Sequence, residues 1–333
     1  MTLSPALQRY LRLAVLLWAG ASAAIAALSL CGFVIAPLDL INQAAPFWLL
    51  IACAGALTAW LALPTGRVTA ATVFAAAALA HGAPIAGELI RPAPRTAADA
   101  SAPRVRIIWL NSQSGSSPEG VTDYIINADA DFVMLAEYHA EGRAIPEEIR
   151  AAYPYFSNCV EPHDCNVVIL SRHEPVSERL EMAAGQSGLR MVWTDYAIAG
   201  APLRLMAVHM RRPYPAARYL AHRRELLAFL GDSDRNNLIL AGDFNATPWS
   251  FALRQFDEQS GLSRHDRAIV TWPAARWTRL RLPAPEAFMP LDHVYSGANW
   301  QLVSVRRGPR TGADHFPIEA EFIWAPFAAD PER

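Results

Sequence analysis

The chain has 333 residues, 53% of them apolar, and a formal net charge of −2, so it is longer and more apolar than a typical single soluble domain. Its 29 cationic residues are all arginines, because no lysine occurs in the sequence. From residue 104 onward, 24 arginines stand against 28 acidic residues, a balance of about −4. This balance disfavours a domain that grips nucleic acid without sequence preference through a basic surface.

The apolar excess is concentrated at the N-terminus. Before residue 88 only four residues are charged: Arg9, Arg12, Asp39 and Arg67. The uncharged runs between them are long enough for the roughly 20 apolar residues that a helix needs to cross a bilayer. We therefore predict a transmembrane region over residues 1–90, with helices at about 13–36, 46–63 and 68–87. In the alternative, the first run is a cleaved signal peptide, since two arginines precede a stretch rich in small residues.

Arginines near the helix ends indicate the orientation of this region, because positive charge is retained on the cytoplasmic side. Arg9 and Arg12 place the N-terminus inside, and the first loop, around Asp39, carries no positive charge. Three crossings then place the C-terminal part outside, although three arginines that follow the third helix argue the other way. We expect a multi-pass protein of a bacterial inner membrane with a periplasmic or extracytoplasmic C-terminal domain.

Residues 91–103 are rich in proline, alanine and small polar residues, which predicts a linker before a globular domain over residues 104–325. Within that domain, Cys159 and Cys165 are close enough in sequence to form a disulfide, as exported domains often do. A metal site that includes His163 is the alternative, but two thiols and one imidazole make an incomplete zinc set.

Apolar runs bounded by polar turns predict strands in the back half of the chain. These runs are 104–110, 131–136, 166–170, 191–198, 203–208, 238–241, 291–295, 301–305 and 318–323. The clearest helical pattern covers 215–230, and we place His222 on its exposed side. Four polar residues end or follow apolar strands, where side chains line a rigid rim: Asn111, Glu137, His209 and Asp243. Such a placement predicts one shared site.

The residues at 238–248 form the most informative motif. An apolar strand runs into Gly242, after which Asp243 and Asn245 point the same way by strand alternation. A carboxylate can orient or deprotonate an attacking water, and an amide can donate to a phosphoryl oxygen. The plainer interpretation is a turn formed by Asp and Asn before Pro248.

Two Asp-His dipeptides, Asp292-His293 and Asp314-His315, are unusual in their close spacing. A carboxylate can keep an adjacent imidazole protonated and fix its tautomer, and such a cation can stabilise a phosphoryl transition state. One of the two dipeptides, with His293, fits equally well as a structural hydrogen-bond pair.

The order of these motifs resembles the endonuclease/exonuclease/phosphatase superfamily, a deoxyribonuclease-I-like group. The resemblance covers residues 111–317 and rests on Asn111, Leu135-Ala-Glu137, the 166–172 stretch, His209 with Pro213, Gly242-Asp-Phe-Asn245, Thr271-Trp272, Leu291-Asp292 and Asp314-His315. It implies an α/β (α+β) fold, a four-layer α-β-β-α sandwich of two packed mixed β-sheets, here preceded by an all-α segment of three transmembrane helices.

The resemblance also implies roles for individual residues. Glu137 would be the main ligand of a divalent cation, Mg²⁺ or Mn²⁺, with Asn111 and Asp314 beside it; oxygen ligands of this kind suit a hard cation. The catalytic residues would be His209, Asp243, Asn245, Asp292 and His315. Asp243 would activate water, Asn245 and His209 would bind phosphoryl oxygens, and His315, oriented by Asp292, would stabilise the transition state. His293 has no firm counterpart in the family.

These residues predict a metal-dependent phosphoester hydrolase that is held at the membrane by its N-terminal helices. Its substrate is a nucleic acid or another phosphodiester, or alternatively a phospholipid headgroup; a third alternative is an inactive, membrane-tethered binding module. The tryptophans and arginines of residues 271–281 suit either stacking on a nucleotide or contact with lipid headgroups. We infer no obligate protein partner.

Overall fold

The computed structural model describes residues 4–63, 65–91, 101–112, 118–138, 145–158, 166–176, 181–182, 187–231, 233–274 and 286–326. Contacts within the chain define two compact units. The first unit consists of Met1–Arg91 together with Thr247–Arg254, and the second consists of Pro92–Ala246 together with Gln255–Arg333. Most of the expected linker, and the cysteine pair at 159 and 165, lie outside the described residues.

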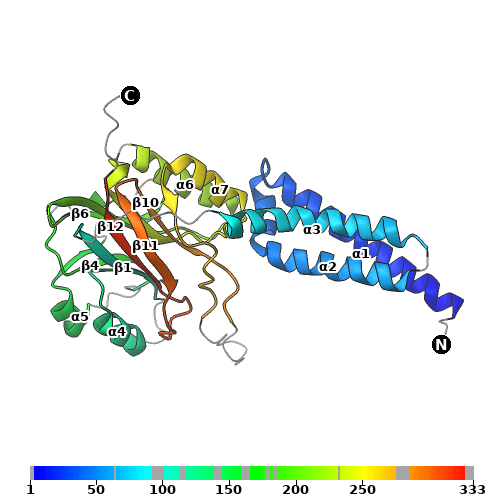
Figure 1. Cartoon of the computed structure of the whole chain (residues 1–333), viewed down its shortest axis with the longest axis horizontal. Helices are drawn as coiled ribbons and strands as arrows, with labels where there is room; N and C mark the ends of the chain where they lie inside the picture. The colour runs from blue at the N-terminus through cyan, green and yellow to red at the C-terminus, as the bar shows by residue number, and fades with distance from the viewer. Residues whose placement is uncertain are drawn as a thin grey trace. The chain divides into compact units, whose positions relative to one another are not determined.

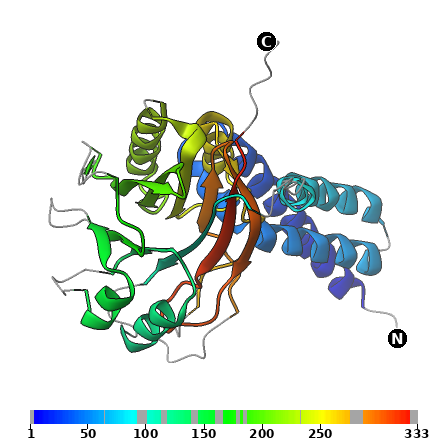
Figure 2. The same cartoon turned by 60° about the vertical axis from the view of Figure 1, so that its left-hand side comes forward.

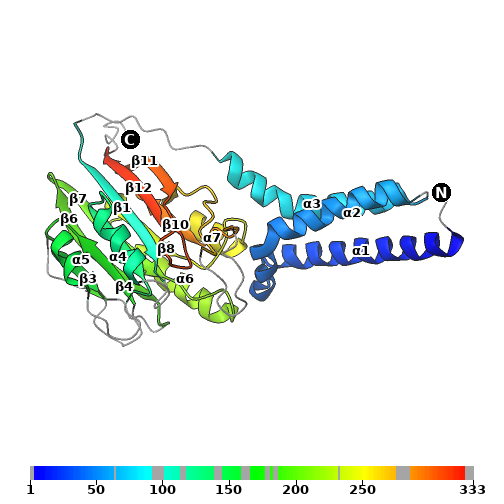
Figure 3. The same ribbon diagram turned by 90° about the horizontal axis from the view of Figure 1, so that it is seen from below.

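The first unit is built on three long helices (Figures 1 and 3). They are α1 (Pro5–Cys31), α2 (Ala45–Ala62) and α3 (Arg67–Ile90), and a 3-10 helix, η1 (Ala36–Ala44), lies between the first two. The first helix, the stretch Ala36–Ala62 formed by η1 and α2, and the third helix are each long and apolar enough to cross a membrane, which fits membrane association. The first helix ends at Cys31 rather than near residue 36, because the chain turns at Gly32 and Pro37 starts η1.

The second unit contains two mixed β-sheets. The first sheet has the order β11 (Trp300–Arg307), β12 (Ile318–Trp324), β1 (Arg104–Asn111), β2 (Phe132–Ala136), β4 (Val167–Ser171) and β3 (Tyr155–Asn158). The second has the order β5 (Glu181–Met182), β6 (Arg190–Ile198), β7 (Ala201–His209), β8 (Leu238–Asp243), β10 (Asp292–Ser296) and β9 (Ser263–Arg264). Each sheet contains one parallel pair, β1 with β2 and β7 with β8.

The central strands are buried on both faces, which explains their nearly continuous apolar sequences. In β1, Ile107 and Trp109 belong to the core between the two sheets, whereas Ile108 and Leu110 belong to a second core under the helices. This alternation follows the two-residue period of a strand. The second sheet contributes to the first of these cores through Leu205 and its neighbours on β7 and β8.

Helices cover the outer faces of both sheets (Figures 1 and 2). On the first sheet, α4 (Pro118–Asn127) and α5 (Glu147–Ala152) pack through Ile125 and Ile149. On the second, Phe229 of α6 (Ala216–Gly231) packs against Trp193, and Phe256 of α7 (Phe251–Ser260) packs against Phe244. The predicted four-layer sandwich is therefore confirmed, and each of the expected strands is present.

The predicted exposure of His222 is wrong. The helix at 216–231 forms as expected, but this imidazole is fully buried. Its Nδ1 accepts a hydrogen bond from the backbone of Arg211, and its Nε2 lies 3.2 Å from the carbonyl oxygen of Ser187. A histidine followed by two charged arginines looks exposed in sequence, yet its ring forms hydrogen bonds with backbone groups inside the unit.

Gly242 allows β8 to pack closely against β7. A Cβ atom at this position would lie 2.5 Å from the backbone oxygen of Val208 and 2.3 Å from its Cγ1. Because the backbone atom cannot move away cheaply, we predict that Gly242→Ala destabilises the chain by about 1–3 kcal/mol, read as a lower midpoint of denaturant unfolding. Gly231→Ala, where nothing lies within 4 Å of the added atom, should not lower the midpoint. Equal midpoints for the two variants would contradict this account.

Candidate active site

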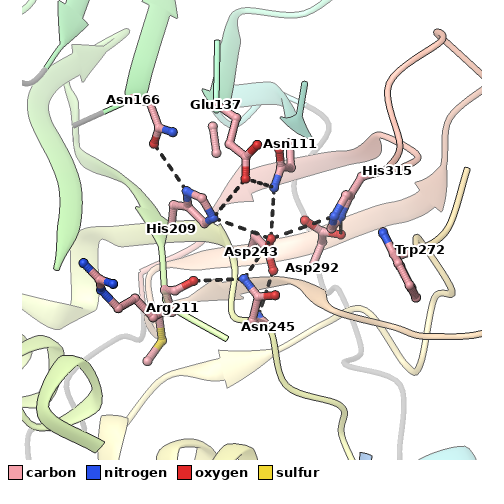
Figure 4. Close-up of polar contacts among 12 residues, drawn as sticks. Asn111, Glu137, Asn166, His209, Arg211, Asp243, Asn245, Trp272, Asp292 and His315 are labelled. Carbon is pink, nitrogen blue, oxygen red and sulfur yellow. Dashed lines mark hydrogen bonds and ion pairs between the residues drawn. The ribbon is translucent and has the colours of Figure 1, made fainter. Parts of the chain in front are cut away.

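The polar strand ends of the two sheets converge at one edge of the sandwich (Figure 4). Asn111 is the last residue of β1, and Glu137 directly follows β2, its parallel neighbour. On the second sheet, Asp243 ends β8, where it pairs in register with His209 on one side and with Asp292 on the other. Two sheets, each with parallel strands ending at this edge, thus bring distant parts of the sequence together.

Two residues at this edge have a left-handed backbone. Glu137 has φ of 56° and Asn245 has φ of 49°, values that are uncommon for residues other than glycine. Such conformations cost free energy and persist only where surrounding contacts hold them, and they cluster at functional sites. Glu137 directly follows β2, and Asn245 comes two residues after the end of β8. The left-handed backbone at each position turns the side chain toward the shared edge.

Asp243 lies at the centre of the hydrogen-bond network and is almost fully buried. Its Oδ2 accepts hydrogen bonds from the side-chain amides of Asn111 at 3.0 Å and Asn245 at 3.1 Å, and its Oδ1 accepts one from the Asn245 backbone at 2.8 Å. Burial and the nearby carboxylate of Asp292 raise the pKa of Asp243 to about 7, although His315 opposes the shift. A carboxyl group with such a pKa can exchange a proton near neutral pH.

His209 faces this carboxylate from β7. Its Nε2 lies 3.5 Å from Glu137 and 3.9 Å from Asp243, and its Nδ1 lies 3.3 Å from the amide oxygen of Asn166. Burial, together with the positive charges of Arg190 and His315, lowers the pKa of His209 to about 3. The ring is therefore neutral at physiological pH, and the orientation of the Asn166 amide decides which nitrogen carries the proton.

His315 has the opposite electrostatic setting. Burial alone lowers its pKa, but Asp292, whose Oδ2 lies 2.7 Å from Nδ1, and then Asp243 and Asp314 outweigh burial and raise it to about 10. The ring is therefore a cation, and its Nε2 points toward Asp243 at 3.9 Å. One side of the site thus holds a neutral imidazole and the other a charged one.

Asp292 is itself fully satisfied by neighbouring donors. Its Oδ1 accepts a hydrogen bond of 2.7 Å from the indole of Trp109, and its Oδ2 accepts one of 2.5 Å from the hydroxyl of Thr271. These donors and His315 lower the pKa of Asp292 against the effect of burial. A carboxylate fixed by three donors sets the orientation of the His315 ring.

The residues expected to hold a cation also lie at this edge. Asn111 donates to Glu137 at 3.4 Å, and Asp314 accepts from the indole of Trp272 at 3.4 Å. Among the described residues, the buried Oδ1 of Asp314 has no hydrogen-bond partner. Burial raises the pKa of Asp314, and the charge of Glu137 adds to the shift. The oxygen atoms of Glu137, Asn111 and Asp314 are of the kind that a hard divalent cation prefers.

A second group of three residues, Asp243, Asp292 and His315, has potential ligand atoms within 4.8 Å of one another. We regard it as a poorer cation site, because His315 is protonated and its Nδ1 is already engaged by Asp292. A protonated imidazole has no lone pair for a metal ion.

The structure brings together the residues that the sequence singled out, at one edge of the unit (Figure 4). Sequence reasoning gave no role to Trp109, Asn166 and Thr271, which contact them, and considered Trp272 only for stacking on a nucleotide or contact with lipid headgroups. Three of these belong to the motifs of the resemblance, so their positions carried a signal, whereas Trp109 reads only as a core residue of β1.

His293 has a structural role, because both of its ring nitrogens bind neighbouring buried groups. Its Nδ1 lies 2.6 Å from the carboxylate of Asp266, and its Nε2 lies 2.8 Å from the carbonyl oxygen of Ala246. Since both partners are acceptors, both ring nitrogens must carry protons, and the Asp266 carboxylate raises the pKa of this buried ring against the effect of burial. The imidazolium thus tethers the chain just after Asn245.

Sequence comparison identifies the group to which this site belongs. The sequence profile of the Endonuclease/Exonuclease/phosphatase family matches residues 108–315, which is more than half of the chain. The chain belongs to this family. Among curated proteins, none matches the sequence.

Solved structures agree with a family fold at low sequence identity. SmcL matches with a TM-score of 0.51 and 16% identity, over 66% of this chain and 99% of that one. The human nocturnin catalytic domain with bound sulfate matches with a TM-score of 0.50 and 16% identity, over 67% of this chain and 96% of that one. D. rerio TDP2 in complex with a single-strand DNA product matches with a TM-score of 0.50 and 15% identity, over 66% of this chain and 98% of that one. At these identities the matches show the endonuclease/exonuclease/phosphatase fold alone.

The contact between Asp292 and His315 can be tested through the protonation of the His315 ring. If the charged ring is the active form, hydrolysis is lost as the pH rises through its pKa. Asp292→Asn removes the largest cause that raises this pKa, so the basic limb of kcat/KM should move to lower pH by roughly 1–3 units.

The control for this prediction is Asp195→Asn, which removes a carboxylate that pairs with Arg204 on the surface. Its basic limb should coincide with that of the unchanged chain. A basic limb that is the same in Asp292→Asn would show that this carboxylate does not set the titration of His315.

Proposed function

We propose that the chain is a membrane-anchored, divalent-metal-dependent phosphoester hydrolase, in which water activated by Asp243 attacks phosphorus in line with the leaving oxygen. The observation that carries this proposal is the electrostatic layout around Asp243. A buried carboxylate with a pKa of about 7 lies between a neutral imidazole, His209, and a charged one, His315.

Asp243 suits the role of general base. Its raised pKa lets it accept a proton from water near neutral pH, and three hydrogen bonds from Asn111 and Asn245 hold it in one orientation. The same contacts place the Asn245 amide beside the carboxylate, where it can donate to a non-bridging phosphoryl oxygen once substrate displaces its present contacts.

The two histidines divide the remaining work. If the Asn166 amide is turned so that its NH₂ group, and not the oxygen that lies 3.3 Å away, faces Nδ1, neutral His209 can donate one hydrogen bond from Nε2 to a phosphoryl oxygen. Charged His315, held by Asp292, can stabilise the negative charge of the pentacovalent transition state or give a proton to the leaving oxygen. Since both rings are held by neighbouring side chains, little reorganisation accompanies the reaction.

Glu137, Asn111 and Asp314 would hold the cation, which we expect to be Mg²⁺ or Mn²⁺. When bound, such an ion supplies Lewis-acid polarisation of a phosphoryl oxygen and neutralises developing charge. The repulsion between Glu137 and Asp314, and the unpartnered Oδ1 of Asp314 among the described residues, support this assignment.

The three apolar helices support a membrane location, and we retain a multi-pass inner-membrane protein with an extracytoplasmic catalytic domain. Two aromatic residues beside the cation ligands bear on the substrate. Trp272 contacts Asp314, and Phe288, which is 55% exposed, packs edge-on against Trp272. An aromatic pair with one exposed ring can stack on a nucleobase, which favours a nuclease or a general phosphodiesterase.

A phospholipid headgroup phosphodiesterase is the second candidate, because helices that cross a membrane would hold the site near lipid headgroups. The full chain in nanodiscs, assayed with Mg²⁺ or Mn²⁺, distinguishes the two. Hydrolysis of plasmid DNA or single-stranded RNA with intact lipid selects the first candidate, and release of headgroups with intact nucleic acid selects the second. Removal of the metal by EDTA should abolish either activity, and added Mg²⁺ or Mn²⁺ should restore it.

Variants test the proposed roles in the same assay. Asp243→Asn and His315→Ala should lower kcat by roughly 10²–10⁴-fold after correction for the folded fraction, because both groups act mainly in the transition state. Asp129→Asn, which changes an exposed carboxylate paired with Arg172, should keep full activity. Near-normal metal-dependent turnover by Asp243→Asn would rule out the proposed mechanism.

A further inference from the structure

Asp39 is a buried acid in a region with almost no charge. It lies on η1 in the first unit, and its side chain is only 6% exposed. Its carboxylate accepts hydrogen bonds from the backbone N–H groups of Phe251 at 2.8 Å and Ala252 at 2.9 Å. A carboxylate in such a place needs partners of this kind, because an unpaired buried charge is costly.

The position of Asp39 is fixed by the end of α1. The side-chain amide of Asn42 donates both to Asp39 at 2.9 Å and to the carbonyl oxygen of Ser29 at 3.0 Å. A Cβ atom at Gly32 would lie 2.8 Å from the backbone nitrogen of Asp39, so this close fold of η1 onto the helix end requires glycine. The carboxylate is therefore held rigidly before it meets its partners.

A second residue of η1 binds the same distant segment. The side-chain oxygen of Gln43 accepts from the backbone of Thr247 at 2.8 Å, and its carbonyl oxygen accepts from the indole of Trp249 at 3.3 Å. The ring of Phe33 packs edge-on against that of Phe251, with centroids 5.5 Å apart. These contacts explain why residues 247–254 belong to the first unit.

Asp39 completes the start of helix α7. The first N–H groups of a helix lack partners within it. Here Asp39 takes those of Phe251 and Ala252, while the hydroxyl of Ser250 takes that of Leu253. The carboxylate is thus a cap supplied from more than 200 residues earlier in the sequence, and its negative charge also suits the positive end of the helix.

The segment that η1 holds, residues 247–252, begins two residues after Asn245. The left-handed backbone of Asn245 requires restraint on both sides, and β8 provides it on one side. On the other side, His293 holds the carbonyl oxygen of Ala246, and Gln43 then holds the backbone of Thr247. The chain from Asp243 to Ala252 is thus fixed at nearly every step.

We propose that Asp39, assisted by Gln43, is a positioning residue for the active site. By fixing residues 247–252, η1 restrains the backbone that carries Asp243 and Asn245, so the apolar helices form part of the working enzyme in addition to attaching it to a membrane. The effect on turnover rests on the proposed function, whereas the anchoring of residues 247–252 does not.

The order of the helices along the chain agrees with this role. η1 follows the first apolar helix, and the segment at 247–254 belongs to the chain that follows the third. One crossing precedes η1 and three precede residues 247–254, so both lie on the same side of a membrane, as their hydrogen bonds require. Asp39, which lies between the first two helices where positive charge is absent, can therefore cap the start of α7.

Amide hydrogen exchange of the full chain in nanodiscs tests the anchoring directly. Asp39→Asn replaces one acceptor oxygen by an amide group and removes the charge, so the amides of Phe251 and Ala252 should exchange at least tenfold faster. The matched control is Glu88→Gln, which removes the other acid of the first 91 residues, a partner of Arg91. Exchange at 251 and 252 should be unchanged in this control.

Kinetics with the hydrolysed substrate test the effect on the active site. Asp39→Asn should lower kcat about tenfold, after correction for the folded fraction, and change KM less than twofold, because the substrate-binding groups remain while Asp243 and Asn245 are less well held. Gln43→Ala, which removes a neutral hydrogen bond and endangers folding less, should shift both measurements in the same direction by a smaller factor.

The possible results separate this inference from the proposed function. Unchanged exchange at Phe251 and Ala252 in Asp39→Asn overturns the anchoring, whatever the activity. Faster exchange with an unchanged kcat overturns the positioning of the active site. If the unchanged chain hydrolyses no phosphoester, the proposed function fails, and the exchange measurement still decides whether η1 holds residues 247–252.

Discussion

The burial of two aspartates and two histidines, Asp243, Asp292, His209 and His315, at one edge of the sandwich is the constraint on which the site depends. Charged groups out of water are stable only when each has a partner, and here the partners are internal. Asp292 is matched by His315, Trp109 and Thr271, so its pKa is lowered, whereas Asp243 lacks a comparable cation and its pKa rises to about 7. The same network thus keeps Asp292 ionised and His315 protonated, and it leaves Asp243 able to exchange a proton.

The fold makes this network possible because parallel strands of both sheets end at the same edge. Asn111 and Glu137 come from one sheet, and His209 and Asp243 from the other. The apolar faces of the strands are shared between the inter-sheet core and the outer helices, so the backbone behind the site is rigid. The strained backbone at Glu137 and Asn245 is the local cost of aiming side chains at a common point.

Much of this could be predicted from the sequence, because buried strands have continuous apolar runs and the residues after them are polar. The strands carrying Asn111, Asp243 and Asp292 were located in this way. Other features depend on partners far apart in the sequence: the burial of His222 between backbone groups, the indole of Trp109 on Asp292, and Asp39 on the start of α7. No local pattern reveals such contacts, since each residue looks ordinary without its partner.

The central claim is that Glu137 and Asp314, with Asn111, hold a divalent cation beside the pair formed by Asp243 and His315. Anomalous diffraction from crystals of the full chain soaked in Mn²⁺ tests it without reference to any substrate. The account predicts a manganese peak within coordination distance, about 2.0–2.6 Å, of carboxylate oxygens of both Glu137 and Asp314. A peak among Asp243, Asp292 and His315 instead, or no peak at this edge of the sandwich, would contradict it.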